Sequence, residues 1–173
     1  MKIKKMKRLI IILIAFFCVG KIQAQQLPQI TQYMINNYTI NPAVSSMYDY
    51  YQVRTSIRNQ WVGIAESPRT TILSIYGKKK QQVGLGGMVF SDVTGPTSRI
   101  GGSFSYAYSF AIYNDVKLSL ALAGGFTQFK IIKSGISVEY QQDPLMSGGD
   151  VVRTLPDATF GINFFNKLWY FGV

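Results

Sequence analysis

Apolar and polar residues alternate with a period of two through most of residues 50–173, and this alternation predicts an all-β protein. In the run from Ile100 to Phe110, every second residue is aromatic, isoleucine or glycine, and the residues between are glycine, serine or alanine. Short and longer connections between such runs alternate, which is typical of an up-and-down antiparallel barrel with two different rims. We therefore predict an antiparallel, up-and-down transmembrane β-barrel that is incomplete, with about seven strands present and more expected in a full-length protein.

The same alternation also fits a soluble β-sandwich, and three features favour the membrane barrel. The second face of the two central strands carries glycine, serine, alanine and threonine, which suit a crowded barrel interior. The run from Tyr51 to Trp61 would extend over roughly 33 Å, and a tilt of about 45° would reduce this to roughly 23 Å of height, close to the apolar band of a membrane barrel. Its two terminal aromatic residues match the two membrane interfaces.

The aromatic face of the run from Ile100 to Phe110 is therefore expected to contact lipid. On this assignment Tyr106→Arg should cost about 2–4 kcal/mol of stability in the membrane. Ser105→Asn, on the opposite face, is expected to be milder.

Each expected strand has one apolar face and one face of small or polar residues. The strands are expected at residues 50–62, 69–77, 83–90, 100–110, 116–130 and 158–165, with a seventh from 168 onward. Tight turns at 78–82, 114–115 and 166–167 alternate with longer loops at 63–68, 91–99 and 131–157. The first strand is then expected to point out of the cell, which places the lysine-rich turn on the periplasmic side.

The organisation along the chain is expected to have three parts. Residues 1–24 have a cationic start, an apolar stretch too short to span a bilayer and a small residue at the end, which predicts a signal peptide that is removed on export. Residues 25–48 are rich in amides and uncharged, and form an N-terminal periplasmic arm. Residues 49–173 form the N-terminal half of an outer-membrane barrel.

The composition excludes several chemistries. Of 18 Lys and Arg, six precede residue 25, which leaves 12 basic against 8 acidic residues, so the charge indicates a targeting segment and not a nucleic-acid partner. After the signal peptide there is no cysteine and no histidine, which excludes the usual zinc sites and Ser-His-Asp or Cys-His catalysis. The eight acids are scattered. We expect no enzymatic activity and no cofactor.

The candidate partner-binding residues lie in loops, on the luminal face and in the arm. Trp61 is either an interfacial anchor or a partner contact, and the turn at residues 92–97 is either structural or a recognition loop. Arg54 and Arg58 face the lumen, where each needs an acid or water, with Asp92, Glu66 and Asp157 as possible acids. The arm either plugs the lumen or simply leads into the first strand. The full set is Trp61, Arg54, Arg58, Asp92, Gly95, Pro96, Arg99, Tyr33, Asn41 and Pro42.

Gly84, Gly86 and Gly87 are not a nucleotide-binding loop, because no helix follows them. Close approach of another backbone is the better explanation of these glycines.

Four stretches resemble the PorP/SprF family of outer-membrane proteins of the type IX secretion system. They are QYMINNYTINPAVSS (32–46), RNQWVGIAESPRT (58–70), VGLGGMVFSDVTGPTSRIGGSFSYAY (83–108) and KLSLALAGGFTQFK (117–130). The chain departs from the common pattern at Glu66-Ser67-Pro68, where Gly-Ala-Pro is more usual. Family members are typically longer, and bacterial barrels have an even number of strands from about eight upward, so we expect this chain to be the first part of a longer barrel.

The resemblance implies a role in export or surface anchoring of large adhesins, including those of gliding motility. The implied partners are the C-terminal sorting domain of a secreted adhesin and periplasmic components of the secretion machine, in addition to the outer-membrane lipid bilayer. A pore for small solutes is the alternative function.

Overall fold

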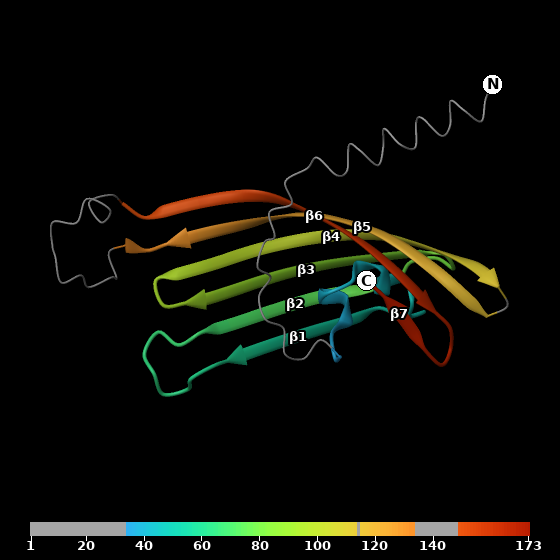
Figure 1. Cartoon of the computed structure of the whole chain (residues 1–173), viewed down its shortest axis with the longest axis horizontal. Helices are drawn as coiled ribbons and strands as arrows, with labels where there is room; N and C mark the ends of the chain where they lie inside the picture. The colour runs from blue at the N-terminus through green and yellow to red at the C-terminus, as the bar shows by residue number, and fades with distance from the viewer. Residues whose placement is uncertain (1–33, 114, 134–148) are drawn as a thin grey trace, which may run out of the picture.

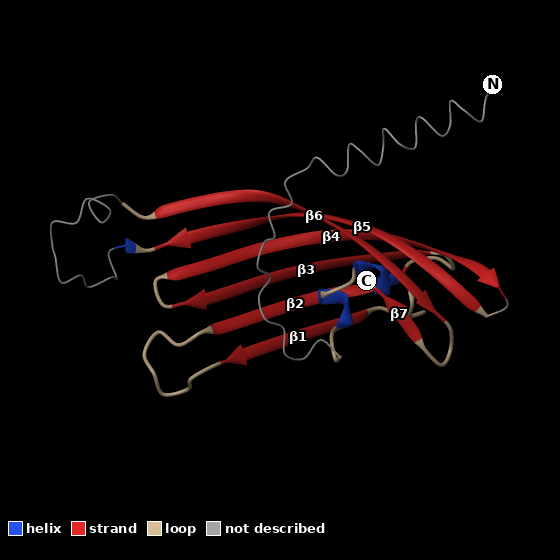
Figure 2. Ribbon diagram, in the orientation of Figure 1, coloured by secondary structure: helices blue, strands red, loops and turns tan. Residues whose placement is uncertain are grey.

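The computed structural model describes residues 34–113, 115–133 and 149–173, and every structural statement concerns these residues. Their strands form one seven-stranded antiparallel sheet in chain order, curled into a half-barrel (Figures 1 and 2). The predicted fold class is confirmed. The strands are β1 (Gln52–Asn59), β2 (Arg69–Lys78), β3 (Val83–Thr94), β4 (Thr97–Tyr113), β5 (Val116–Ile131), β6 (Val151–Phe165) and β7 (Tyr170–Gly172).

Two 3₁₀-helices precede the sheet and lie against its concave face. They are η1 (Asn37–Thr39) and η2 (Pro42–Ser46), and η2 contacts β2 to β6. In Figure 1 both lie in front of the sheet, near the end at which β7 begins. The described part of the chain contains no helix long and apolar enough to span a bilayer.

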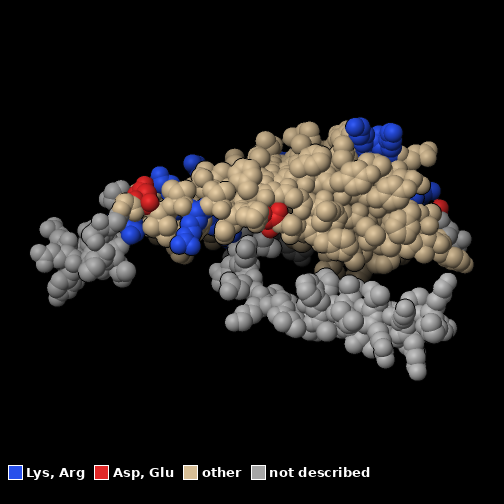
Figure 3. Space-filling model, turned by 90° about the horizontal axis from the view of Figure 1, so that it is seen from above, with Lys and Arg blue, Asp and Glu red and all other residues tan. Residues whose placement is uncertain are grey.

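The convex face is apolar and exposed. Cross-strand neighbours such as Leu85, Tyr106 and Leu122 form rows across the sheet on this face. Arg69 and Lys130, both at the ends of their strands, are the charged residues that this face carries in the described strands. Figure 3 shows Lys and Arg gathered mainly toward the two ends of the molecule. The side chains most exposed on this face are Val53, Ile57, Phe104, Leu122, Phe160 and Phe171.

The uncharged part of this face, between the strand ends, has the height of a bilayer's apolar core. From Ile100 to Phe110 it extends for roughly 33 Å along β4, which a tilt of about 45° reduces to roughly 23 Å, against about 25 Å for a membrane barrel. The length estimate made for residues 51–61 therefore applies to β4, because β1 is shorter than expected. An exposed apolar surface of this extent needs apolar surroundings, as lipid provides.

The strand boundaries differ most from the sequence-based expectation in three places. The loop expected at 91–99 is only a tight turn at Gly95-Pro96, since β3 continues to Thr94 and β4 begins at Thr97. Asp92 and Arg99 fall within the expected loop, but they are cross-strand partners on the concave face. The positive φ of 52° at Gly95 allows the tight turn.

The other two differences concern β6 and β1. Strand β6 begins at Val151 and not near 158, although it contains Pro156. Strand β7 pairs only with the C-terminal end of β6, so the missing N–H of Pro156 faces no described strand. Strand β1 ends at Asn59, which places Trp61 beyond the strand, in a loop and with a positive φ of 51°.

Neighbouring residues of β6 provide a matched test of the two faces. Phe160 is 61% exposed on the convex face, and Thr159 is exposed on the concave face. Phe160→Arg should lower the free energy of folding into vesicles by about 2–4 kcal/mol, and Thr159→Arg by less than about 1 kcal/mol. The measurement is a urea titration of folding into lipid vesicles, and equal losses would contradict the assignment of the faces.

Thr159 replaces Ser105 as the concave control. Ser105 is completely buried under the N-terminal segment, so the expectation that Ser105→Asn is mild is abandoned.

Candidate functional site

Residues Asn36–Met47, the plug segment, fill one end of the concave face. Asn41 caps η2 by accepting a hydrogen bond from the backbone N–H of Ala43 at 2.9 Å, and Pro42 occupies the first helical position, where its missing N–H costs nothing. The Ser45 hydroxyl donates to the Pro42 carbonyl at 2.8 Å. Short-range bonds of this kind give the segment its two tight turns without any partner strand.

Hydroxyl and amide groups join the plug segment to four strands, β2, β4, β5 and β6, and one of the strand hydroxyls, that of Ser105, bonds in turn to β3. Asn36 Nδ2 donates to Ser74 Oγ of β2 at 2.9 Å. Asn41 Nδ2 donates to the Ile162 carbonyl of β6 at 2.8 Å. The remaining bonds are Ser46 Oγ to Ser119 Oγ (2.7 Å), Ser119 Oγ to the Ala43 carbonyl (2.9 Å), Tyr38 Oη with Ser105 Oγ (2.7 Å) and Ser105 Oγ to the Gly86 carbonyl (3.4 Å). Buried hydroxyls with partners of this kind stabilise one seating of the segment.

Tyr38 is the central side chain of the plug segment. Its ring stacks on Tyr76 of β2 with centroids 4.6 Å apart and an interplanar angle of 12°, and Val44 and Met88 pack around the pair. Burial raises the pKa of the Tyr38 phenol above its ordinary value. The phenol is therefore neutral at physiological pH and keeps its hydrogen bond with Ser105.

Glycines in the strands make room for the plug segment. A Cβ added to Gly86 would lie 2.6 Å from the Tyr38 ring, and one added to Gly84 would meet the backbone of Ser45 and Ser46. A Cβ on Gly161 would meet Asn41 and Pro42. Close approach of another backbone is thus confirmed for Gly84, whereas Gly86 accommodates the Tyr38 side chain and Gly87 has no neighbour closer than 3.8 Å.

The chain between the plug segment and β1 is fixed at the lysine turn. Lys78 Nζ donates to Asp49 Oδ1 at 2.6 Å, and this hydrogen bond holds the pKa of Asp49 below its ordinary value. The plug segment therefore lies at the end of the half-barrel that contains the lysine turn.

The ten residues expected to bind partners do not form one site. Asn41 and Pro42 lie in the plug segment, where they hold η2 against β6. Tyr33 lies outside the described residues. Arg54, Arg58, Asp92 and Arg99 lie on the concave wall, and Trp61, Gly95 and Pro96 lie in the connections at the opposite end from the lysine turn.

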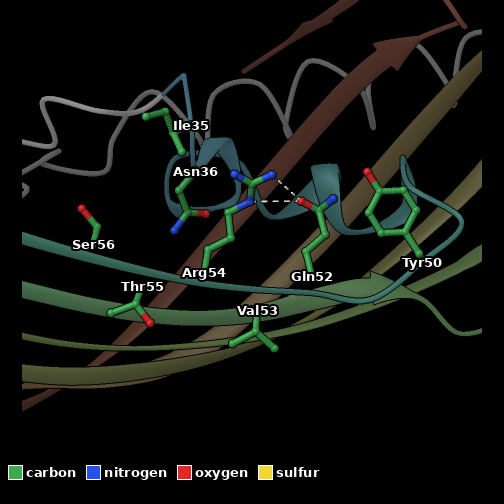
Figure 4. A pocket seen from close by; sticks show the side chains of 8 residues that line it. All are labelled: Ile35, Asn36, Tyr50, Gln52, Val53, Arg54, Thr55 and Ser56. Carbon is green, nitrogen blue, oxygen red and sulfur yellow. Dashed lines mark hydrogen bonds between the residues drawn. The ribbon is translucent and has the colours of Figure 1, made fainter.

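Arg54 has a different partner from the acids expected for it. Its Nε and Nη2 donate to Gln52 Oε1 at 3.0 and 2.7 Å (Figure 4). The two side chains line a cavity of about 480 Å³ together with Asn36 of the plug segment. Val53 and Thr55 point to the other side of β1 in the same view, as the alternation requires.

The connections at the end away from the lysine turn, which we call the loop rim, are joined by backbone hydrogen bonds. The Gly95 N–H donates to the Glu66 carbonyl at 3.1 Å, and the Ile132 N–H donates to the Pro96 carbonyl at 2.8 Å. Trp61 and Val62 are 68% and 84% exposed in the β1–β2 connection. The loop rim is thus a connected surface with exposed apolar side chains.

Sequence reasoning did not identify the residues that hold the plug segment. Tyr38, Ser74, Ser105 and Ser119 make these contacts. The one feature of the sequence that indicated these contacts was the row of small residues on the concave faces of β4 and β5. Such a row predicts close packing, but it does not predict which segment packs against it. No group of three His, Cys, Asp or Glu residues suited to a metal ion occurs in the described ranges.

The apolar convex face and the concave face, one end of which is filled, define a membrane protein of the β-barrel type with a segment of its own chain inside. Residues 22–173 match the family model of the type IX secretion system membrane protein PorP/SprF, so the chain belongs to this family. The family is one of secretion-system membrane proteins and not of enzymes. No curated protein and no solved structure matches the chain.

Two adjacent glycines test the seating of the plug segment. Gly86→Ala should displace the Tyr38 ring and increase hydrogen exchange in residues 36–47 by at least about tenfold, since a well-packed site cannot absorb a 2.6 Å contact. Gly87→Ala is the control, because its Cβ would have no neighbour closer than 3.8 Å. Hydrogen exchange is measured by mass spectrometry on the protein in detergent. Exchange in both variants at the wild-type rate would contradict this position of the plug segment.

Proposed function

We propose that this protein is an outer-membrane component of type IX secretion that docks an exported adhesin and holds it at the cell surface, without enzymatic activity. Membership of the family supports the secretion role. The observation that carries the docking mechanism is the plug segment, because a sheet whose concave face is filled by its own chain is suited to anchoring.

The orientation follows the general pattern of outer-membrane barrels, which have short periplasmic turns and longer outer loops. On this basis the plug segment and the lysine turn face the periplasm, and the loop rim faces outward. Periplasmic components of the machine would then meet the plug end, and the sorting domain of the adhesin would meet the loop rim. Residues 1–24 would be the signal peptide that directs export.

The loop rim has the properties of a protein-binding surface. Its exposed tryptophan provides a large, rigid contact area, and tryptophan is enriched among residues that dominate binding energy. The left-handed backbone at Trp61 and Glu66 orients this loop, and the bond from Gly95 fixes it to the neighbouring turn. We assign partner contact to Trp61, Gly95 and Pro96 among the ten candidates.

A photo-crosslinking amino acid placed at Val62 should capture the sorting domain of an adhesin exported by the same cell. The matched control is Val53, which is 67% exposed on the convex face and should contact lipid. Crosslinked products are detected with antibodies against the sorting domain. Capture at position 53 but not at 62 would contradict the docking surface.

The alternative, a pore for small solutes, makes a different prediction. A docking protein with a filled lumen should show no steady single-channel conductance in a planar bilayer, whereas a pore should conduct. Steady conductance in the wild type that is unchanged in Gly86→Ala would favour the pore, because the plug segment would then not control the path.

A further inference from the structure

Beyond the plug segment, the concave face has a row of charged side chains. Arg58 of β1, Asp92 of β3, Arg99 of β4 and Arg153 of β6 occupy one register row across the sheet, together with Thr70 and Phe129. All lie on the concave face, because each has the parity of the buried residues on its own strand. Arg58, Arg99 and Arg153 are called the arginine row below.

The row carries an excess of positive charge. Asp92 is the one acid in this row, and it lies directly opposite Arg99 and accepts a hydrogen bond from Thr70 Oγ1 at 2.6 Å. Within this row of the described strands, three guanidinium groups are thus present with one carboxylate. Such a wall concentrates a positive field, which attracts anions.

The row is separated from the plug segment and lies next to the loop rim. The adjacent register row is uncharged, and in it the Phe90 ring packs over Gly101, where a Cβ would lie 2.5 Å from the ring. On the other side, the turn at Gly95-Pro96 begins within a few residues of Asp92 and Arg99. The arginine row is thus placed where a partner entering from the loop rim would arrive.

We propose that the arginine row binds an acidic polypeptide segment of the exported partner. This inference rests on the proposed function and names the chemistry of the partner. Guanidinium groups bind carboxylates in planar, bidentate geometry. A polypeptide is favoured over lipid phosphates, because the exposed apolar face that suits lipid is the convex one and the row lies on the concave one.

The spacing of the row suits an extended chain. Arg58 and Arg99 are three strands apart, or roughly 14 Å, and Arg99 and Arg153 are two strands apart, or roughly 10 Å. Alternate side chains of an extended peptide share a face, so carboxylates four residues apart lie on one face about 13 Å apart. An acidic stretch of six residues lying across the strands can therefore contact two neighbouring arginines of the row at once.

The test uses a fluorescein-labelled hexaglutamate peptide and the protein purified in detergent, with binding followed by fluorescence anisotropy. The wild type should bind the peptide, and affinity should fall as salt rises. The triple variant Arg58→Gln, Arg99→Gln, Arg153→Gln should bind at least about tenfold more weakly. The control variant Arg69→Gln, Lys79→Gln, Lys80→Gln removes the same charge elsewhere and should bind within about twofold of the wild type.

Several results would overturn the proposal. One is an equal loss of affinity in the two triple variants. Another is a hexaglutamine peptide that binds as tightly as hexaglutamate. A third is competition by free glutamate or inorganic phosphate that is as strong as competition by the unlabelled peptide. Circular dichroism checks folding, and if the triple variant does not fold, the single variant Arg153→Gln replaces it, with an expected loss of about threefold. Unchanged binding in that variant would also overturn the proposal.

The two proposals fail separately. Capture of the sorting domain at position 62 without hexaglutamate binding would overturn only the acidic-segment inference. Hexaglutamate binding without capture would overturn the docking role and leave an anion site.

Discussion

The close contact between the plug segment and the small residues of the concave wall is the constraint on which the rest of the structure depends. Gly84 and Gly86 have no Cβ, and the serines of β4 and β5 present only a hydroxyl, so a folded segment can lie directly on the strands. The same residues could not form a core with another apolar layer, because they have almost no apolar surface to bury. The hydrophobic residues are consequently placed on the convex face, and the protein needs lipid there to replace the core it lacks.

The alternation in the sequence predicted the strands and both faces because it is a local property of each strand. The predicted ends of the strands were less accurate than the faces, because there a residue's surroundings depend on the neighbouring strand. Asp92 and Arg99 were assigned to a loop because they flank the turn residues Gly95 and Pro96, but each is opposite the other across β3 and β4. Pro156 suggested a loop for a similar reason, although it lies on a part of β6 with no described neighbour.

The position of the plug segment could not be predicted from the sequence, because the residues it contacts are far from it along the chain. Tyr38 bonds to a residue 67 positions away and Ser46 to one 73 positions away, and neither pair has complementary charges or a motif that marks it. An amide-rich, uncharged stretch is equally consistent with a simple leader. Only the glycines indicated that another backbone approaches β3, and they did not say which one.

The position of the plug segment also determines what the remaining concave surface can do. It covers the end with the lysine turn, where its hydrogen bonds use the serine hydroxyls and its chain occupies the room above Gly84 and Gly86. The other end of the concave wall has long charged side chains next to the loop rim. A partner arriving from that rim would therefore meet exposed tryptophan first and arginine further in, while the plug segment limits how far it can enter. This order of apolar contact followed by charge recognition is how a surface can both hold a partner and select it, since the charged contacts penalise a segment of the wrong sign.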